Sequence, residues 1–213
     1  MSLSLKQVPL LFLPPVVVQL WHGLHRSIAR VVAQRRIAAH SRLHLACGDH
    51  LLVGWANVDM HGPRHVIRWD LTRALPIATA SMDFVYSEHF IEHIDRHQAE
   101  RLLRECRRVL KPGGVLRVST PSLRVLVDEY DAGRVLGWQD MGWTPATPCQ
   151  LLNEGMRMWG HQYIFDAPEL EGLMRGAGFS QIVARPWRQS PHDALANLEC
   201  RPYHGELIYD CSA

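Results

Sequence analysis

The sequence predicts a doubly wound α/β fold built on a seven-stranded, mainly parallel sheet, and two observations lead to this expectation. From Ser41 onward, short apolar runs are separated by turns, with clear helices between some of them, which is typical of strands joined by crossover helices. The chain has 213 residues, of which 47% are hydrophobic and 21% are charged, as expected of one compact globular domain. We expect strands near 42–46, 55–59, 65–69, 83–87, 114–119, 179–184 and 206–211.

Two helices are predicted between these strands. The first runs from Asp95 to Leu110, where Asp95 and Gln98 have the spacing of a capping box. Its apolar stripe comprises Ala99, Leu102, Leu103, Cys106, Val109 and Leu110, and Lys111-Pro112-Gly113-Gly114 ends it. The second runs from Ala167 to Ala177, with Asp166 as its cap and Gly178 after its end. The stretch from Val135 to Gly160 is expected to be an irregular, functional loop.

Residues 1–40 are expected to form an N-terminal helical extension of a main domain at 41–213. The segment 19–37 places Leu20, Leu24, Ile28, Val31 and Val32 at helical spacing among Arg26, Arg30, Arg35 and Arg36. A basic amphipathic helix of this kind packs on its own domain, covers an active site as a lid, or makes a peripheral contact with an anionic membrane. The sequence leaves these roles open. The apolar run 8–20 is too short to span a bilayer.

Composition narrows the classes of partner. A formal net charge of +2, with arginines scattered along the chain, argues against a nucleic-acid partner. The five cysteines are an odd set without a Cys-x-x-Cys pair, which indicates a reducing compartment. We therefore expect a cytoplasmic protein that acts on a small molecule, and a homodimer is left open.

Three successive strand ends carry residues suited to a nucleoside. The segment Leu43 to Asp49 is an apolar strand that ends in small residues, where a backbone can approach a ligand closely. Asp59 ends the second strand and is placed to accept both ribose hydroxyls. Asp70 ends the third and is placed to accept a hydrogen bond from an adenine amino group. The sequence thus predicts a nucleoside site at one edge of the sheet.

Two later segments extend this pattern. They are Ser81-Met82-Asp83-Phe84-Val85-Tyr86-Ser87-Glu88-His89-Phe90-Ile91-Glu92-His93 and Arg108-Val109-Leu110-Lys111-Pro112-Gly113-Gly114. Together with Leu43 to Gly48 and Gly54 to Asp59, this order closely resembles the compact branch of class I S-adenosylmethionine-dependent methyltransferases over about residues 42–120. That branch reads L-x-L-G-C-G, G-W-x-N-V-D, S-x-D-x-[IV]-x-[AS]-x-H-x-[LI]-E-H and R-V-L-K-P-G-G. The resemblance implies strand order 3-2-1-4-5-7-6 with an antiparallel last strand.

The resemblance also implies S-adenosylmethionine as the cofactor. Ala46, Cys47 and Gly48 would flank its methionine part, Asp59 would hold the ribose, Asp70 with Leu71 would meet the adenine, and Ser87 would lie beside it. Three positions depart from the pattern: Ala46 and His50 stand where the first and third glycines of the G-x-G-x-G turn are usual, and His44 stands where an acid is often found.

The resemblance continues more loosely downstream and leads to catalytic candidates. Trp159 to Asp166 resembles G-H-x-x-x-[YF]-[DST], which would place His161 near the acceptor. Methyl transfer from a sulfonium needs mainly alignment of the acceptor, and a hydroxyl acceptor also gains from a base. His89, Glu88 and His161 are the candidates for that base. We expect O-methylation of a sugar, a glycan precursor or a secondary metabolite.

Two other functions stay open at this point. His89-Phe90-Ile91-Glu92-His93 also matches H-x-x-E-H, the pattern of a metal-dependent hydrolase, and His97 would extend the row by a turn. A cofactor-binding protein without catalysis is the third class. We expect no resident metal.

The aromatic and methionine residues of the later chain are a further candidate group. They are Trp138, Met141, Trp143, Met156, Met158 and Trp159. Such residues line an acceptor pocket or belong to the core.

Overall fold

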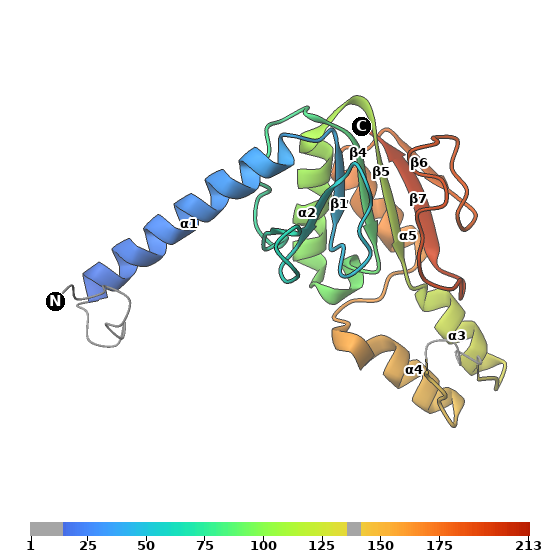
Figure 1. The fold of residues 1–213 in the computed structure, drawn as a ribbon. Coiled ribbons are helices and arrows are strands. Elements are labelled where there is room, and N and C mark those ends of the chain that lie inside the picture. Colours follow the sequence, from blue (N-terminus) through green and yellow to red (C-terminus); the bar gives the residue numbers. More distant parts are fainter. Residues whose placement is uncertain (1–14, 136–141) are drawn as a thin grey trace.

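The computed structural model describes residues 15–135 and 142–213 and contains one seven-stranded sheet (Figure 1). The strands are β1 (Arg42–Leu45), β2 (Ala56–Asp59), β3 (Ile67–Arg68), β4 (Met82–Glu88), β5 (Leu110–Thr120), β6 (Gln181–Ala184) and β7 (Leu207–Ser212). Their order is β3-β2-β1-β4-β5-β7-β6. The pairs from β3 to β5 are parallel, and β7 runs antiparallel to both of its neighbours. The predicted order and the antiparallel last strand are confirmed.

The central strands β4 and β5 are apolar and mostly buried, as expected for strands covered on both faces. β5 begins at Leu110, earlier than the sequence predicts, because Leu110 already pairs with Met82. The pairing then shifts to Phe84 with Val115. The segment 111–114 is therefore an irregularity within β5 rather than a turn before it.

Two predicted helices pack on one face of the sheet. The helix α2 (Arg96–Val109) begins after Asp95, whose side chain accepts from the Gln98 backbone in a complete capping box. The helix α5 (Ala167–Gly176) begins after Asp166, which accepts from the backbone N–H of Glu169. Their buried apolar stripes join the largest core cluster against β1, β4 and β5. Both helix predictions are confirmed, with ends shifted by one residue.

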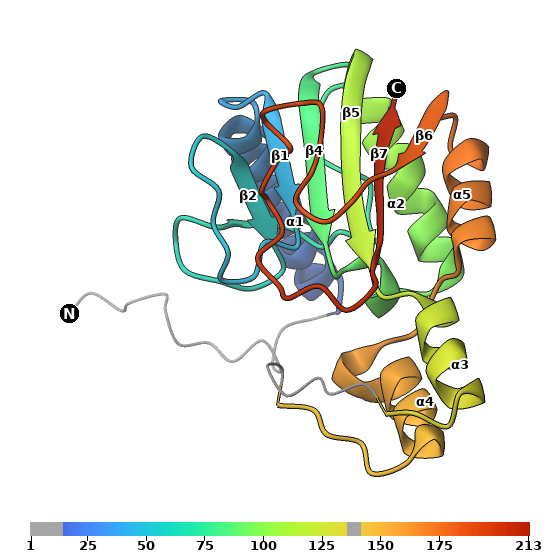
Figure 2. The same ribbon diagram turned by 90° about the vertical axis from the view of Figure 1, so that its right-hand side faces the viewer.

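The opposite face of β1 and β4 is covered by irregular chain. Figure 2 shows the segment 186–206, between β6 and β7, crossing in front of these strands, with α2 behind the sheet and α5 beside β6. A second core cluster forms beneath it from Trp55, Tyr86, Val115 and Leu195. The segment is held by Arg117 of β5, which is fully buried and pairs with Glu199 at 2.6 Å and with Asp210 of β7 at 2.8 Å.

The helix α1 (Pro15–Ile37) leaves the body of the molecule as a long projection (Figure 1). Its last turns pack on the body: Ala33 and Ile37 are buried in the main core, and the helix contacts β3 at the edge of the sheet. Ile28, Val31 and Val32, three members of the predicted stripe, are 52%, 47% and 50% exposed. Among the helices described, none is long and apolar enough to cross a membrane.

Two further helices lie beyond the carboxyl ends of β4 and β5, side by side in both ribbon views (Figures 1 and 2). They are α3 (Leu123–Asp131) and α4 (Pro148–Arg157). The prediction of an irregular loop over 135–160 is thus wrong for α4. The signal for it was present, because Thr147 caps the helix and Pro148 occupies its first turn.

Candidate active site

The first of two neighbouring cavities lies at the carboxyl ends of β1, β2 and β3. We call it the strand-end cavity, and it is lined by Ala46, Asp59, Met60, Trp69, Asp70, Leu71, Thr72, Phe90, His93, Ile94, Gln98 and Gln162. The position agrees with the general rule that open α/β sheets bind ligands beyond the carboxyl ends of their strands. Four of the residues predicted to bind the cofactor line it, namely Ala46, Asp59, Asp70 and Leu71.

The turn after β1 is shaped for close approach by a ligand. Ala46 and Gly48 both have positive φ values, of 53° and 50°, a conformation that costs energy for alanine and persists where the surroundings enforce it. No atom would lie within 4 Å of a Cβ added at Gly48. Its backbone N–H donates to Asp59 Oδ2 at 3.0 Å, and that of His61 donates to Oδ1 at 3.0 Å. Asp59 therefore joins the turn to the end of β2.

These residues fit a nucleoside cofactor. An ionised carboxylate offers about four acceptor sites, and Asp59 uses two for the backbone, which leaves two for ribose hydroxyls. Trp69 lines the cavity, and its buried Nε1 has no hydrogen-bond partner among the described residues. A buried donor of this kind gains from a ligand acceptor.

Other predicted cofactor contacts are placed differently. Asp70 Oδ1 accepts from both the backbone and the hydroxyl of Thr72, and Oδ2 pairs with Arg73 at 2.9 Å. Its carboxylate therefore stabilises its own turn as well as lining the cavity. Cys47 and Ser87 are buried and line neither of the two cavities. Gly48 lines neither cavity, and its backbone N–H donates to Asp59.

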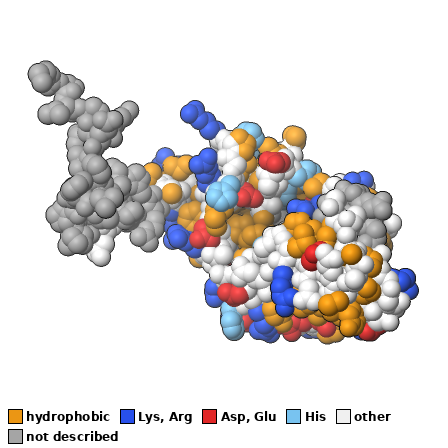
Figure 3. All heavy atoms as spheres, turned by 90° about the horizontal axis from the view of Figure 1, so that it is seen from below, with side chains coloured by type: hydrophobic (Ala, Val, Ile, Leu, Met, Phe, Trp, Pro, Cys, Tyr) orange, Lys and Arg blue, Asp and Glu red, His pale blue; other side chains and the backbone are white. Residues whose placement is uncertain are grey.

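The second cavity opens beside the first, between the end of β4, the pair α3 and α4, and the segment before β7. We call it the histidine cavity, and it is lined by His89, His93, Pro121, Ser122, Val125, Leu126, Trp143, Gly155, Trp159, His161, Arg201, His204 and Glu206. Figure 3 looks onto this end of the molecule and shows histidine side chains, in pale blue, among apolar ones in orange. A mainly apolar wall with a few polar groups is typical of a small-molecule site.

A buried carboxylate organises the histidines. Glu92 is fully buried, and its Oε1 lies 3.3 Å from His89 Nδ1 and 4.0 Å from His93 Nε2. Its Oε2 accepts from the Thr120 hydroxyl at 2.9 Å. Burial alone would raise the pKa of Glu92, but the interaction with His89 outweighs it, so the pKa lies below its usual range. Glu92 is therefore a buried acidic group whose Oε1 lies near two imidazoles.

His161 is held with a defined proton position. Its Nδ1–H donates to the Gly155 carbonyl oxygen at 2.9 Å, which leaves Nε2 as the lone-pair nitrogen of the neutral ring. Burial lowers the pKa of His161, so the ring is neutral at neutral pH. The backbone N–H groups of Gln162 and Tyr163 donate to the Glu92 carbonyl, which brings this segment against the end of β4.

His93 lines both cavities. Its ring centroid lies 5.0 Å from that of His161, which continues to Trp159 at 5.5 Å and on to Trp143 at 5.2 Å. Trp159 has a positive φ of 57°, which breaks the short helix there and turns the chain. The sequence did not single out His93 as a base, because no local pattern shows that two cavities meet at it.

Glu88, one of the predicted bases, is engaged elsewhere. Its carboxylate accepts from the backbone N–H groups of Cys200 and Arg201, each at 3.2 Å. Burial would raise the pKa of Glu88, but the hydrogen bonds from Cys200 and Arg201 outweigh it and lower the pKa. Glu88 lines neither of the two cavities. His89 has a φ of 48°, so the chain turns sharply there and the two neighbouring side chains separate.

The helical basis of the metal-hydrolase alternative is absent from this part of the chain. Only Ile91–His93 is helical, as a single 3-10 turn, and His89 precedes it. His89 and His93 are thus not one α-helical turn apart, although both meet Glu92. His97 lies on α2 and is exposed. The carboxylate and imidazoles that could share an ion here are those of Glu92, His93 and His161.

Several expectations about the cover of the site are also revised. None of the described α1 residues lines either cavity. Ser27, Ala29 and Arg30 of α1 line a neighbouring hollow that shares Met60, Trp69 and Asp70 with the strand-end cavity, so a lid role for this helix stays a prediction. Of the aromatic and methionine group, Trp143 and Trp159 line the histidine cavity, whereas Met156 and Met158 are exposed outside it. Trp138 and Met141 lie outside the described residues.

Arg201, His204 and Glu206 are wall residues that the sequence did not indicate. They follow no motif, and they reach the cavity because the segment before β7 is fastened to Glu88 and Arg117. A contact between positions more than 80 residues apart leaves no local trace in the sequence.

The fold and the strand-end cavity define an α/β protein of the nucleoside-binding class. Residues 43–118 match the family described as "Methyltransferase domain". A protein of Mycolicibacterium smegmatis, named as a probable S-adenosylmethionine-dependent methyltransferase, is 34% identical over 61% of this chain and 46% of its own length. A protein with the same description from Mycobacterium tuberculosis is 30% identical over 73% of this chain and 46% of its own length. The chain thus spans about half the length of these curated relatives.

Solved structures agree on the fold. A possible histamine N-methyltransferase from Thermotoga maritima, 17% identical, aligns over 90% of this chain and 96% of its own with a TM-score of 0.52. An S-adenosylmethionine-dependent methyltransferase from Archaeoglobus fulgidus, 14% identical, aligns over 88% and 94% with a TM-score of 0.50. With the sequence match, this shows that the chain has a class I S-adenosylmethionine-dependent methyltransferase domain.

Proposed function

We propose that this protein transfers a methyl group from S-adenosylmethionine, held in the strand-end cavity, to a hydroxyl of a small acceptor held in the histidine cavity. The observation that carries the proposal is that the two cavities are adjacent and share His93. When bound, S-adenosylmethionine supplies a methyl group on a positively charged sulfur, so the protein need not activate the leaving group.

The residues of the chain then have separate tasks. Asp59 and the backbone of the Ala46 to Gly48 turn hold the cofactor, and Trp69 offers its free indole N–H. His93 takes the proton of the acceptor hydroxyl, since it lines both cavities. Glu92 is a positioning residue that orients the imidazoles of His89 and His93.

The acceptor we favour is a sugar, a glycan precursor or a secondary metabolite. The rings of Trp143 and Trp159 offer flat apolar surface, while Arg201, His204 and Glu206 bring polar groups to the same cavity. That mixture suits a compact, hydroxyl-rich molecule with one apolar face. A cytoplasmic location remains a prediction from the cysteines.

Calorimetry with S-adenosylmethionine tests the cofactor site. Asp59→Ala removes the carboxylate that joins the turn to β2, and we expect it to weaken binding at least tenfold. Asp49→Ala is the matched control, because Asp49 is an exposed carboxylate of the same turn outside both cavities. No binding by the wild-type protein, or equal binding by Asp59→Ala, would contradict the assignment.

Methyl transfer to sugars and metabolites with a labelled cofactor tests the base. We expect His93→Gln to lower kcat about 10²–10⁴-fold, the usual contribution of general acid–base catalysis, while cofactor affinity changes little. The exposed His97→Gln is the control. Full activity in His93→Gln would refute the role of His93. Cofactor binding without transfer to any acceptor would favour the non-catalytic alternative, and activity that needs added zinc would favour the hydrolase.

A peripheral membrane contact by α1 is a further proposal. Ile28, Val31 and Val32 are about half exposed, and Figure 3 shows apolar and basic side chains together where the described part of α1 leaves the body. Apolar residues flanked by arginines favour an anionic surface. We expect co-sedimentation with phosphatidylglycerol vesicles that Val31→Asp abolishes and Gln34→Asp, which adds the same charge, only weakens. Sedimentation as a dimer that Val31→Asp dissociates would instead assign this face to a second copy.

A further inference from the structure

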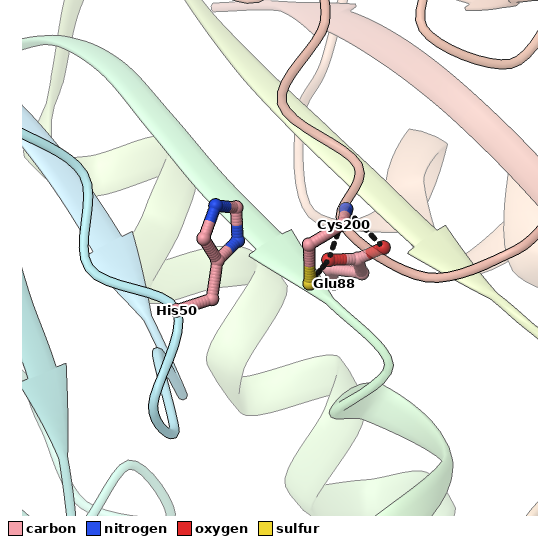
Figure 4. Close-up of side chains that lie close together, drawn as sticks. All are labelled: His50, Glu88 and Cys200. Carbon is pink, nitrogen blue, oxygen red and sulfur yellow. Dashed lines mark hydrogen bonds between the residues drawn. The ribbon is translucent and has the colours of Figure 1, made fainter.

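Three metal-ligating side chains meet outside the two cavities. His50 lies in the turn after β1, Glu88 ends β4, and Cys200 belongs to the segment 186–206 (Figure 4). One ligand atom from each, a ring nitrogen, a carboxylate oxygen and the Sγ, lie within 4.8 Å of one another. These residues are far apart in the sequence, so the sheet and the covering segment bring them together.

The donor atoms are turned toward a common point. Figure 4 shows one ring nitrogen of His50 facing Glu88 and Cys200, and the buried Nδ1 of His50 has no hydrogen-bond partner among the described residues. The Cys200 thiol donates to Glu88 Oε2 at 3.0 Å. The Glu88 carboxylate is held in place by the backbone N–H groups of Cys200 and Arg201. The Glu88 carboxylate and the Cys200 thiol are thus already held in position. The His50 Nδ1 has no hydrogen-bond partner among the described residues that a metal ion would have to displace.

We propose that His50, Glu88 and Cys200 bind a zinc ion. An imidazole nitrogen, a carboxylate oxygen and a thiolate are all ligands that Zn²⁺ accepts in tetrahedral geometry. With bonds of about 2.1 to 2.3 Å, two tetrahedral ligands lie about 3.6 Å apart. The longest separation in the cluster, no more than 4.8 Å, therefore has to shorten by at most about 1.2 Å. Three protein ligands leave a fourth position for water.

Binding exchanges a proton for the ion. The thiol hydrogen that now bridges Cys200 and Glu88 leaves to solvent as Zn–S forms, because the metal ligand is the thiolate. Cys200 is exposed, so an ion and the released proton have a path to water. Affinity should accordingly rise with pH.

The ion would connect the turn after β1 to the segment 186–206. The His50 turn carries the backbone that faces the strand-end cavity, and Cys200 precedes Arg201 of the histidine cavity. Zinc at this place would fix the segment 186–206 against the ends of β1 and β4. This inference does not depend on the proposed methyl transfer, because it rests on residues outside both cavities.

Zinc titration of the reduced, chelator-treated chain of 213 residues, in competition with a chromophoric chelator, tests the site. We expect one ion per chain in the wild type and at least about tenfold weaker binding in Cys200→Ser and His50→Gln. Cys149→Ser, which removes another exposed cysteine, is the matched control. His161→Gln is the second control, because it disrupts the other candidate group of Glu92, His93 and His161.

Cobalt substitution gives a readout that needs no enzymatic activity. A thiolate-to-cobalt charge-transfer band should appear in the wild type and in Cys149→Ser and be missing in Cys200→Ser, with circular dichroism establishing that each variant is folded. The proposal fails if the wild-type chain binds no zinc. It also fails if Cys200→Ser and His50→Gln bind as the wild type does, or if His161→Gln is the variant that loses the ion.

Discussion

Protonation of His44 should destabilise the protein in mildly acidic solution. His44 lies in β1, with 2% of its surface exposed, and contacts the Tyr86 ring at 5.0 Å between centroids. Its Nδ1–H donates to Asn57 Oδ1 at 3.1 Å, since the Asn57 amide nitrogen is occupied by two carbonyls. Burial, the largest cause, lowers the pKa of His44 from 6.5 to about 4, despite the hydrogen bond to Asn57.

The pH window follows from these two pKa values. Between about pH 6.5 and pH 4, the unfolded chain binds a proton at His44 that the folded protein does not. Lowering the pH through this window therefore favours the unfolded state. Stability is complete above about pH 6.5, and at pH 5 the linkage amounts to a loss of about 2 kcal/mol.

Urea unfolding at pH 7 and pH 5 measures this loss. His44→Gln keeps a donor for Asn57 but does not titrate, so its free energy of unfolding should fall by about 2 kcal/mol less than that of the wild type over the same interval. His97→Gln, at an exposed position of α2, should behave as the wild type does. Equal losses in the wild type and His44→Gln would show that His44 is not held neutral by burial.

Three further substitutions probe the site and its supports. Glu92→Gln removes the buried carboxylate charge 3.3 Å from His89 Nδ1. It should lower kcat about tenfold to a hundredfold, while calorimetry shows unchanged cofactor affinity. An unchanged kcat would exclude the positioning role of Glu92. Gly155→Ala would place a Cβ 2.8 Å from Leu126 Cδ2 and so push α4 away from α3. It should raise the KM for the acceptor several-fold. Gly172→Ala is the control and should leave KM unchanged, because no atom would lie within 4 Å of the added Cβ. Arg117→Met leaves the buried carboxylate of Glu199 without its cation and leaves Asp210 with Arg185 as its remaining arginine. It should lower the free energy of unfolding by about 3–5 kcal/mol. The exposed Arg104→Met should lower it by less than about 1 kcal/mol, and similar losses in both variants would contradict this prediction.

The sequence by itself determined the features that depend on local chemistry. The strands, the capping box of α2 and the strand order implied by the resemblance agree with the structure. The strand-end residues Ala46, Asp59 and Asp70 line one cavity, and their contact with the cofactor stays a prediction. Periodicity, caps and turn residues act over a few neighbouring positions, so they can be predicted from the sequence. The helix α4 could also have been predicted from Thr147 and Pro148. The prediction missed it because these residues lie in a stretch rich in Gly, Pro and Trp.

Only the tertiary structure decided which way the side chains at the end of β4 point and what meets them. Glu88 and His89 are neighbours in the chain, yet the positive φ at His89 sends one toward Cys200 and the other toward Glu92. His93 becomes the meeting point of two cavities because Gln162, 69 residues later, bonds to its carbonyl oxygen. The direction of a side chain at a strand end depends on one backbone angle and on partners far along the chain. The neighbouring residues in the sequence predict neither the angle nor the partners.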